Sequence, residues 1–129
     1  MNEIKGAILS SAVSPMVMEE RGTATKRYRF SHDFIGFSGH FPGYPILPAF
    51  IQIMMACTLA EELKGRALEL ATIEKAKFLL EIGPEQEILV LIRERTIGAR
   101  PGCEARLVVN DEVAASFRMS FEEEDGGTA

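Results

Sequence analysis

The chain has 129 residues and a formal net charge of −5 at pH 7, and 47% of its residues are hydrophobic. This length suits a single domain with a substantial core. The negative charge argues against nucleic-acid binding, because a nucleic-acid surface needs cations to neutralise phosphates. No apolar run approaches the roughly 20 residues that cross a bilayer, so we expect no membrane segment.

The cysteines and the two ends of the chain point to a cytoplasmic protein. Cys57 and Cys103 show neither metal-ligand spacing nor a disulfide framework, so we expect reduced thiols and no metal site. The first residues include an acid and precede no cleavable apolar segment, so no signal peptide is predicted. Residues 122–129 begin with four acids and are predicted to form a disordered tail, which leaves residues 1–121 as one domain.

The first half of the chain predicts two strands, a loop and a helix. Residues 8–20 mix apolar and small residues and predict a first strand. Residues 25–31 alternate, with Tyr28 and Phe30 on the apolar face, which predicts a second strand. Residues 35–48 hold three glycines and three prolines and predict a loop.

A single helix is predicted from Pro48 or Ala49 to about Lys64. The segment is rich in Ile, Met, Ala and Leu, has no internal glycine or proline, and ends before Gly65, a typical helix terminator. Because it is apolar on nearly all sides, we expect it to be buried.

Four apolar segments after Gly65 predict four more strands, over residues 68–82, 86–97, 103–110 and 112–121. Asn110-Asp111 predicts a tight hairpin between the last two. Strands joined by turns predict an antiparallel meander. A curved antiparallel sheet wrapped around one buried helix is the hot-dog fold, of the α+β class. The open sheet edge predicts association with a second copy.

The loop before the helix carries the most informative residues. His40 is followed by Pro42, Pro45 and Pro48, which force a stiff, extended loop, and Pro48 suits the first turn of a helix. The imidazole is therefore held beside a helix N-terminus among aromatic residues. We interpret His40 as a catalytic base in an apolar pocket. The alternative is a loop histidine whose ring forms a hydrogen bond with a backbone group.

The stretch from His40 to Pro48 resembles the signature of the bacterial 3-hydroxyacyl-[acyl-carrier-protein] dehydratases, which have the hot-dog fold. Residues 34–39, 73–78 and 109–115 are also similar to that family. The resemblance implies a hydro-lyase that removes water from a 3-hydroxyacyl thioester to give the trans-2-enoyl product, in fatty-acid or related lipid or polyketide biosynthesis. It further implies a homodimer or dimer-based oligomer, acyl carrier protein as partner, a substrate carried on phosphopantetheine, and no metal or organic cofactor.

The same resemblance assigns residue roles. His40 would take a proton from C2, and the backbone N–H of Ala49 would hydrogen-bond the thioester carbonyl. A helix N-terminus offers free N–H groups and a positive dipole end where the enolate oxygen forms. The residues expected to bind the substrate are Phe37, Phe41, Gly43, Pro45, Phe50 and Met54.

Met54 departs from the family, which carries Glu or Asp at this helix position to handle the departing hydroxyl in the partner subunit's site. A thioether cannot donate a proton, and losing a general acid costs about 10²–10⁴ in rate. Glu61 and Glu62 are almost two turns further on. The sequence therefore predicts an atypical or weakened dehydratase, and two alternatives stay open: a non-catalytic acyl-thioester-binding subunit paired with a homologue, or a hot-dog acyl thioesterase.

Four basic residues are candidates for partner binding. Lys75 and Lys77 alternate along one predicted strand, and Arg93 and Arg95 are expected on its neighbour. Such charges are ordinary on a strand face that is exposed to solvent. The alternative is a binding surface for the acidic carrier protein, because complementary charges steer encounters.

Overall fold

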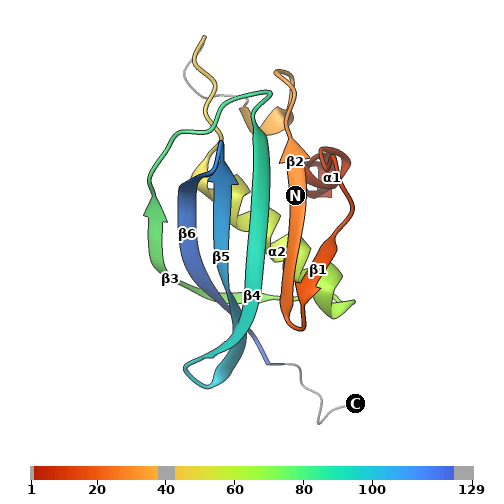
Figure 1. Ribbon diagram of the computed structural model, residues 1–129, viewed down its shortest axis with the longest axis vertical. Coiled ribbons are helices and arrows are strands. Elements are labelled where there is room, and N and C mark those ends of the chain that lie inside the picture. The colour runs from red at the N-terminus through yellow and green to blue at the C-terminus, as the bar shows by residue number, and fades with distance from the viewer. Residues whose placement is uncertain (1, 38–42, 124–129) are drawn as a thin grey trace.

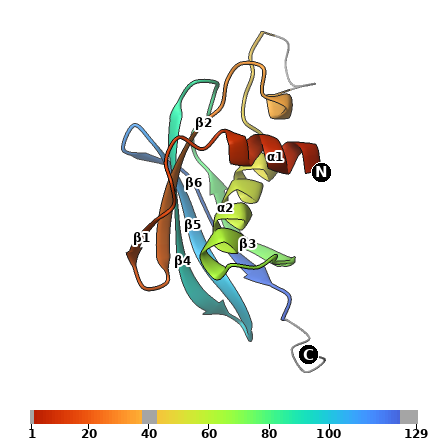
Figure 2. The same ribbon diagram turned by 90° about the vertical axis from the view of Figure 1, so that its right-hand side faces the viewer.

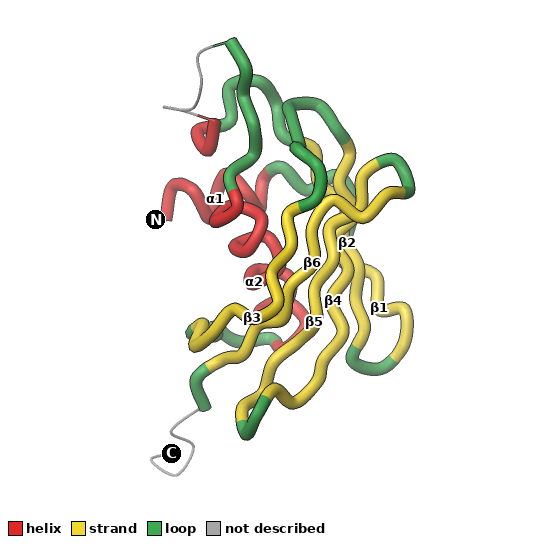
Figure 3. The backbone as a smooth tube through the Cα atoms, turned by 90° about the vertical axis from the view of Figure 1, so that its left-hand side faces the viewer, coloured by secondary structure: helices red, strands yellow, loops and turns green. Residues whose placement is uncertain are grey.

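Six antiparallel strands form one curved sheet in the described part of the chain, and a long helix lies against its concave face (Figure 1, Figure 3). The structure is a computed structural model that describes residues 2–37 and 43–123. Its elements are α1 (Asn2–Ser10), β1 (Val17–Glu20), β2 (Thr23–Arg29), the 3₁₀ turn η1 (Ile35–Phe37), α2 (Ala49–Lys64), β3 (Leu70–Phe78), β4 (Glu87–Ile97), β5 (Arg100–Val109) and β6 (Glu112–Phe121).

The core lies between the sheet and α2, which contacts β4, β2 and β5. Alternate residues of β4, namely Ile88, Val90 and Ile92, are fully buried, as are Met55 and Leu59 of α2. Burial of each such side chain contributes about 1.5–3 kcal/mol. Figure 2 shows α1 and α2 on the same side of the sheet. This arrangement confirms the predicted hot-dog architecture.

The helix α2 begins and ends where the sequence predicts. Pro48 precedes it in an extended conformation, with φ −66° and ψ 155°. Gly65 ends it at φ 74°, and its N–H donates to the Glu61 carbonyl at 2.8 Å. Burial is incomplete at one end, because Phe50 is 49% exposed and Met54 is half-buried in the single chain. One apolar flank of α2 is therefore left uncovered.

The predicted first strand over residues 8–20 is wrong in its first half. Residues Asn2–Ser10 form α1, and only Val17–Glu20 form a strand. Ile4 and Ile8 share one helical face and pack on the core, a spacing that favours a helix over a strand. The Ser11 hydroxyl donates to the Ala7 carbonyl at 2.7 Å, next to the end of the helix.

The predicted meander holds for β4, β5 and β6 but not for β3. The strand order is β1-β2-β4-β5-β6-β3, so β3 pairs with β6 at the sheet edge. Asn110 and Asp111 form the predicted hairpin turn, with φ values of 51° and 64°. The segment between β3 and β4 is not a tight hairpin, because β3 pairs with β6 instead of β4. Within this segment, the Ile82 carbonyl accepts from the Leu47 N–H at 2.7 Å.

β3 is an exposed edge of the sheet. Its residues from Glu74 to Phe78 are all exposed, and Phe78, Leu79 and Leu80 are 40–59% exposed. Such an edge flanked by apolar side chains is typical of an association surface. Within the described residues, no helix has the length and hydropathy needed to cross a membrane.

The acidic tail predicted for residues 122–129 falls mostly outside the described residues, which end at 123. Its first residue is held by the sheet. The Glu122 N–H donates to the Glu69 carbonyl at 2.8 Å, and its carboxylate pairs with Arg100 at 2.7 Å.

Candidate functional site

A cavity of about 190 Å³ lies at the N-terminal end of α2. Its walls come from the loop before α2, the first turn of α2 and the segment that follows β3. The Leu47 N–H donates to the Ile82 carbonyl, and this bond joins the loop before α2 to the segment that follows β3. The lining residues are Ile46, Leu47, Ala49, Gln52, Phe78, Leu79, Leu80 and Glu81. Five of the eight are large apolar side chains, which favour an acyl ligand over a polar one.

The backbone N–H of Ala49 is a free hydrogen-bond donor in this wall. Ala49 is the first residue of α2, so its N–H has no acceptor within the helix. The Pro48 carbonyl is used by the N–H groups of Ile51 and Gln52, at 3.1 and 3.2 Å. Among the described residues, no group accepts from Ala49 N–H. Together with the positive end of the helix dipole, it can polarise a carbonyl placed in the cavity.

Gln52 adds a second polar group to the cavity. The side chain is only 4% exposed, and its Nε2 donates to the Leu47 carbonyl at 3.2 Å. That bond fixes the orientation of the amide, because a flipped amide would set oxygen against oxygen. The Oε1 atom is buried and has no hydrogen-bond partner among the residues that the structure describes. Gln52 is not among the site residues expected from the sequence.

Glu81 is the one carboxylate among the residues that line the cavity. The Tyr44 hydroxyl donates to its Oε1 at 2.5 Å, and this bond raises the pKa of Tyr44. Both side chains are exposed in the single chain. Sequence reasoning missed Glu81, although an acid between Leu80 and Ile82 interrupts an apolar run and was a usable signal.

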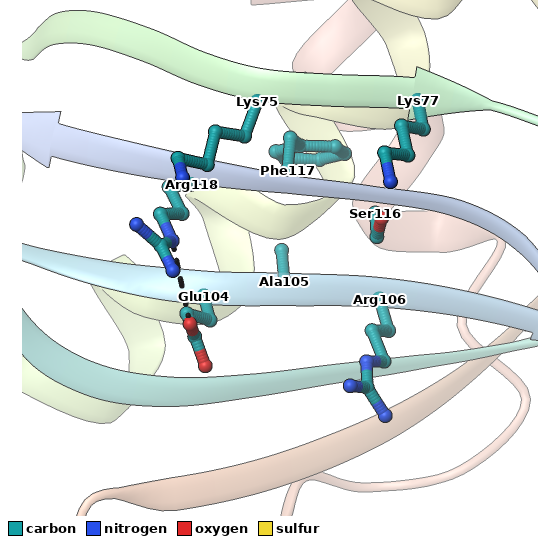
Figure 4. A pocket seen from close by; sticks show the side chains of 8 residues that line it. All are labelled: Lys75, Lys77, Glu104, Ala105, Arg106, Ser116, Phe117 and Arg118. Carbon is teal, nitrogen blue, oxygen red and sulfur yellow. Dashed lines mark ion pairs between the residues drawn. The ribbon is translucent and has the colours of Figure 1, made fainter.

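A second hollow, of about 210 Å³, lies on the outer face of the sheet (Figure 4). It spans β3, β6 and β5, and register places Lys77 beside Ser116 and Ser116 beside Arg106. The lining residues are Lys75, Lys77, Glu104, Ala105, Arg106, Ser116, Phe117 and Arg118. Four cations therefore meet one carboxylate in a protein that is acidic overall.

Glu104 neutralises one side of this hollow only. It pairs with Arg95 and, at 3.4 Å, with the Nε of Arg118. Lys75, Lys77 and Arg106 make no ion pair with any residue that the structure describes. The hollow thus presents three unpaired positive charges to solvent.

Comparison with known proteins assigns the family. The model of the ApeI-like family, described as ApeI dehydratase, matches residues 17–116. The chain belongs to the ApeI-like dehydratase family. The match runs from the start of β1 into β6 and includes α2 with its cavity.

Curated relatives of this ApeI-like chain are dehydratases too. The 3-hydroxyacyl-[acyl-carrier-protein] dehydratase FabZ of Streptococcus suis is 27% identical over 113 residues, covering 81% of this chain and 79% of the relative. The FabZ protein of Streptococcus pyogenes serotype M5 is 29% identical over 115 residues, covering 81% and 80%. These similarities confirm the resemblance found in the sequence.

Solved structures confirm the hot-dog fold. The dehydratase heterocomplex ApeI:P from Xenorhabdus doucetiae matches with a TM-score of 0.75 at 20% identity, covering 87% of this chain and 96% of that one. The PaaI protein from the phenylacetic acid degradation operon of Escherichia coli matches with a TM-score of 0.68 at 15% identity, covering 95% and 92%. At these identities the likeness shows the fold alone.

The predicted site residues of this member of the ApeI-like family fall into three groups. His40 and Phe41 lie outside the described residues. Ala49 lines the cavity, as its predicted role requires. The third group, which lies outside the cavity lining, consists of Phe37, Gly43, Pro45, Phe50 and Met54.

Members of the third group have different surroundings. Phe37 is buried in the core, where its ring meets that of Phe34 edge-on at 5.6 Å. Phe50 and Met54 follow one another on the uncovered flank of α2, four residues apart and therefore on one face. A ligand or partner that contacts this flank would meet both side chains. The roles assigned to these residues stay predictions.

The expected placement of the basic residues is wrong in one respect. Lys75 and Lys77 line the same hollow, but Arg93 and Arg95 lie on β4, which is separated from β3 by β5 and β6. The cause is the pairing of β3 with β6 instead of β4.

Other reactive groups of the chain are not arranged for catalysis. Glu61 pairs with Lys5 at 2.8 Å and accepts from the Leu68 N–H at 2.9 Å. Burial raises the pKa of both Cys57 and Cys103 to about 12, so the thiols are neutral at physiological pH. A neutral buried thiol is a poor nucleophile and metal ligand.

Proposed function

We propose that this chain removes water from a 3-hydroxyacyl thioester carried by acyl carrier protein and releases the trans-2-enoyl thioester. Membership of a dehydratase family and similarity to the FabZ dehydratases support this proposal. The observation that carries it is the free N–H of Ala49, which opens the helix α2 beside an apolar cavity. The elimination needs no metal or organic cofactor in this scheme.

The thioester carbonyl oxygen would accept from the Ala49 N–H. This bond withdraws electrons from the carbonyl, which makes the C2 proton more acidic, and it stabilises the enolate that follows. The positive end of the α2 dipole acts in the same direction. His40, on the loop that leads to Pro48, is the proposed base, because an imidazole titrates near neutral pH. The apolar walls of the cavity would hold the first carbons of the acyl chain.

Hydrolysis of the thioester is the less favoured reaction at this site. It requires an activated water molecule beside the carbonyl, and the cavity walls at Leu47, Phe78 and Leu79 are apolar. The position on α2 where a water-activating carboxylate is expected holds Met54. The match to dehydratases therefore favours elimination over hydrolysis, although the lining includes one carboxylate, Glu81.

We further propose that a second subunit covers β3 and the uncovered flank of α2. The exposed side chains of Phe50, Phe78 and Leu79 would be buried in such a dimer. The second subunit is another copy of this chain or a homologue. The solved ApeI dehydratase is part of a heterocomplex, which favours a second candidate function, that of a subunit working with a homologous dehydratase.

The acidic carrier protein is proposed to dock on the outer hollow, where Lys75, Lys77 and Arg106 are unpaired. Lys77 lies one residue before Phe78, which lines the cavity at α2. A carrier bound at the hollow would therefore sit close to the cavity that receives its acyl group. Complementary charge accelerates such encounters more than it tightens the final complex.

The purified chain, loaded with 3-hydroxybutyryl-carrier protein, tests the function. Formation of the enoyl thioester by mass spectrometry, and its loss in His40→Ala, is the expected result. Release of free thiol without enoyl product would indicate a thioesterase instead. Absence of both products, with activity appearing only after a homologous dehydratase is added, would favour the subunit role.

A further inference from the structure

We propose that Glu81 donates the proton that leaves with the 3-hydroxyl group, in place of the acid that position 54 lacks. This inference rests on the proposed dehydratase function. Its basis is placement: Glu81 lines the same cavity as Ala49, and no other Asp or Glu is among the lining residues.

The backbone on either side of Glu81 is anchored. The Ile82 carbonyl accepts from the Leu47 N–H at 2.7 Å, which holds Glu81 beside the start of α2. The N–H groups of Leu79 and Leu80 donate to the Ala114 carbonyl at 2.8 and 3.2 Å. Glu81 therefore projects from a segment that is fixed to β6 on one side and to the α2 loop on the other.

The cavity offers the two ends of the substrate different partners. A thioester carbonyl at the Ala49 N–H leaves C3, two carbons further along, inside the same 190 Å³ space. The 3-hydroxyl there can accept from the carboxyl of Glu81, which lines this space. A saturated or 2-enoyl chain has no group for this contact.

Tyr44 completes the arrangement. Its hydroxyl donates to Glu81 Oε1 at 2.5 Å, and Tyr44 is 58% exposed. That bond fixes one carboxylate oxygen and leaves the other for the substrate. The exposed phenol also connects the carboxylate with solvent, from which a proton can return after each turnover.

In the elimination step, every bond that breaks is matched by one that forms. The base removes the C2 proton, and the C2–H electron pair forms the C2–C3 double bond. The C3–O bond breaks, and its electron pair stays on the leaving oxygen. That oxygen takes the proton of the Glu81 carboxyl and departs as water.

Glu61 and Glu85 are poorly placed for this role. Glu61 is engaged by Lys5 and by the Leu68 N–H. Glu85 lies four residues after Glu81, and its N–H donates to the Phe30 carbonyl at 2.7 Å, but it does not line the cavity. Glu85 is therefore a matched control for Glu81.

The test compares Glu81→Gln and Glu85→Gln on two thioesters. With 3-hydroxybutyryl thioester, Glu81→Gln should lower the elimination rate at least about 10²-fold, the typical contribution of a general acid, while Glu85→Gln keeps the wild-type rate. With 3-fluorobutyryl thioester both variants should match wild type, because fluoride leaves without needing a proton. Thermal unfolding of each variant verifies that it folds.

Three outcomes would overturn the role of Glu81. These are a Glu81→Gln rate equal to wild type on the hydroxyl substrate, an equal loss on both substrates, and a wild type that eliminates fluoride but not water. The last outcome would still support the base and the Ala49 donor. A wild type inactive on both substrates would instead overturn the proposed function.

Discussion

The side-chain amide of Gln52 donates from Nε2 to the carbonyl oxygen of Leu47 at 3.2 Å, and this leaves its Oε1 buried without a partner. Helical side chains point toward the helix N-terminus, so a glutamine in the first turn can reach back to the preceding loop. A buried acceptor without a donor costs about 1–3 kcal/mol. Gln52 helps to line the cavity, so this cost arises beside the proposed site.

Gln52→Met should therefore separate stability from activity. The variant loses one hydrogen bond to Leu47 but also removes the unpaired Oε1, so the free energy of unfolding should change by less than about 1 kcal/mol. Its kcat/KM for a 3-hydroxyacyl thioester should fall about tenfold, because the loop that leads into Ala49 then loses the bond that holds its Leu47 carbonyl. Urea unfolding and initial rates measure the two quantities.

Gln86→Met provides the matched control for that substitution. Gln86 lies outside the cavity, and its Oε1 accepts from the Gly83 N–H at 2.7 Å. This variant should lose about 1 kcal/mol of stability and keep its kcat/KM. A Gln52→Met variant that behaves like Gln86→Met would show that Gln52 is only structural.

Ala49 allows the proposed carbonyl donor to be removed almost without touching the fold. Proline is well tolerated at the first helical position, and Pro48 already has the extended conformation that a following proline requires. Ala49→Pro should keep the thermal midpoint within a few degrees yet lower kcat about 10²–10³-fold, as the loss of an oxyanion donor does. Ala49→Gly keeps the N–H and should remain active. Equal activity of the proline and glycine variants would contradict the assignment.

The outer hollow can be tested by charge reversal. Lys77→Glu with Arg106→Glu should lower kcat/KM about tenfold or more for a carrier-bound substrate at low salt, because steering by charge is lost. The same variant should act normally on a small pantetheine thioester. Added salt should narrow the difference from wild type, since ions screen surface charges.

Arg93→Glu is the control for this experiment, because Arg93 is exposed on β4 and does not line the hollow. It changes the charge of the protein in the same sense. If Arg93→Glu lowers kcat/KM for the carrier-bound substrate to the same extent, the carrier does not dock specifically on the hollow. The effect would then come from a surface elsewhere or from the overall charge of the sheet.

The parts of the fold that the sequence predicts are those set by local signals. Pro48 and Gly65 mark both ends of α2, and no residue between them interrupts a helix. The turn at Asn110-Asp111 and the alternating strands around it identify β5 and β6. The partner of β3 could not be predicted, because pairing with β6 depends on a strand that comes much later in the chain.

The same distinction between local signals and long-range contacts applies to the candidate site. The role of Ala49 was implied by the family resemblance, and its place at the start of α2 follows from Pro48, which is a local feature. Glu81 was missed, because it reaches the start of α2 only through the bond between Leu47 and Ile82. Gln52 was not predicted, because the orientation of its amide depends on the Leu47 carbonyl, which is held in place by that same loop.

Three buried groups predict how stability depends on alkaline pH. Burial raises the pKa of Cys57 and of Cys103 from 9.0 to about 12. Burial also raises the pKa of Tyr28 from 10.0 to about 12, although the nearby Thr58 opposes this rise. In the unfolded chain these groups ionise near their ordinary values. Between pH 9 and 12 the unfolded state therefore binds fewer protons than the folded state.

The stability that these groups contribute is complete below pH 9 and is lost as the pH rises toward 12. The urea midpoint should consequently fall steadily above pH 9, and the fall should be shallower in Cys103→Ala, which removes one of the three groups. Urea titrations at several pH values, with a reductant present to keep the thiols free, measure both slopes. A midpoint that stays constant to about pH 11 would contradict the burial of these groups, because the folded and unfolded states would then bind protons equally.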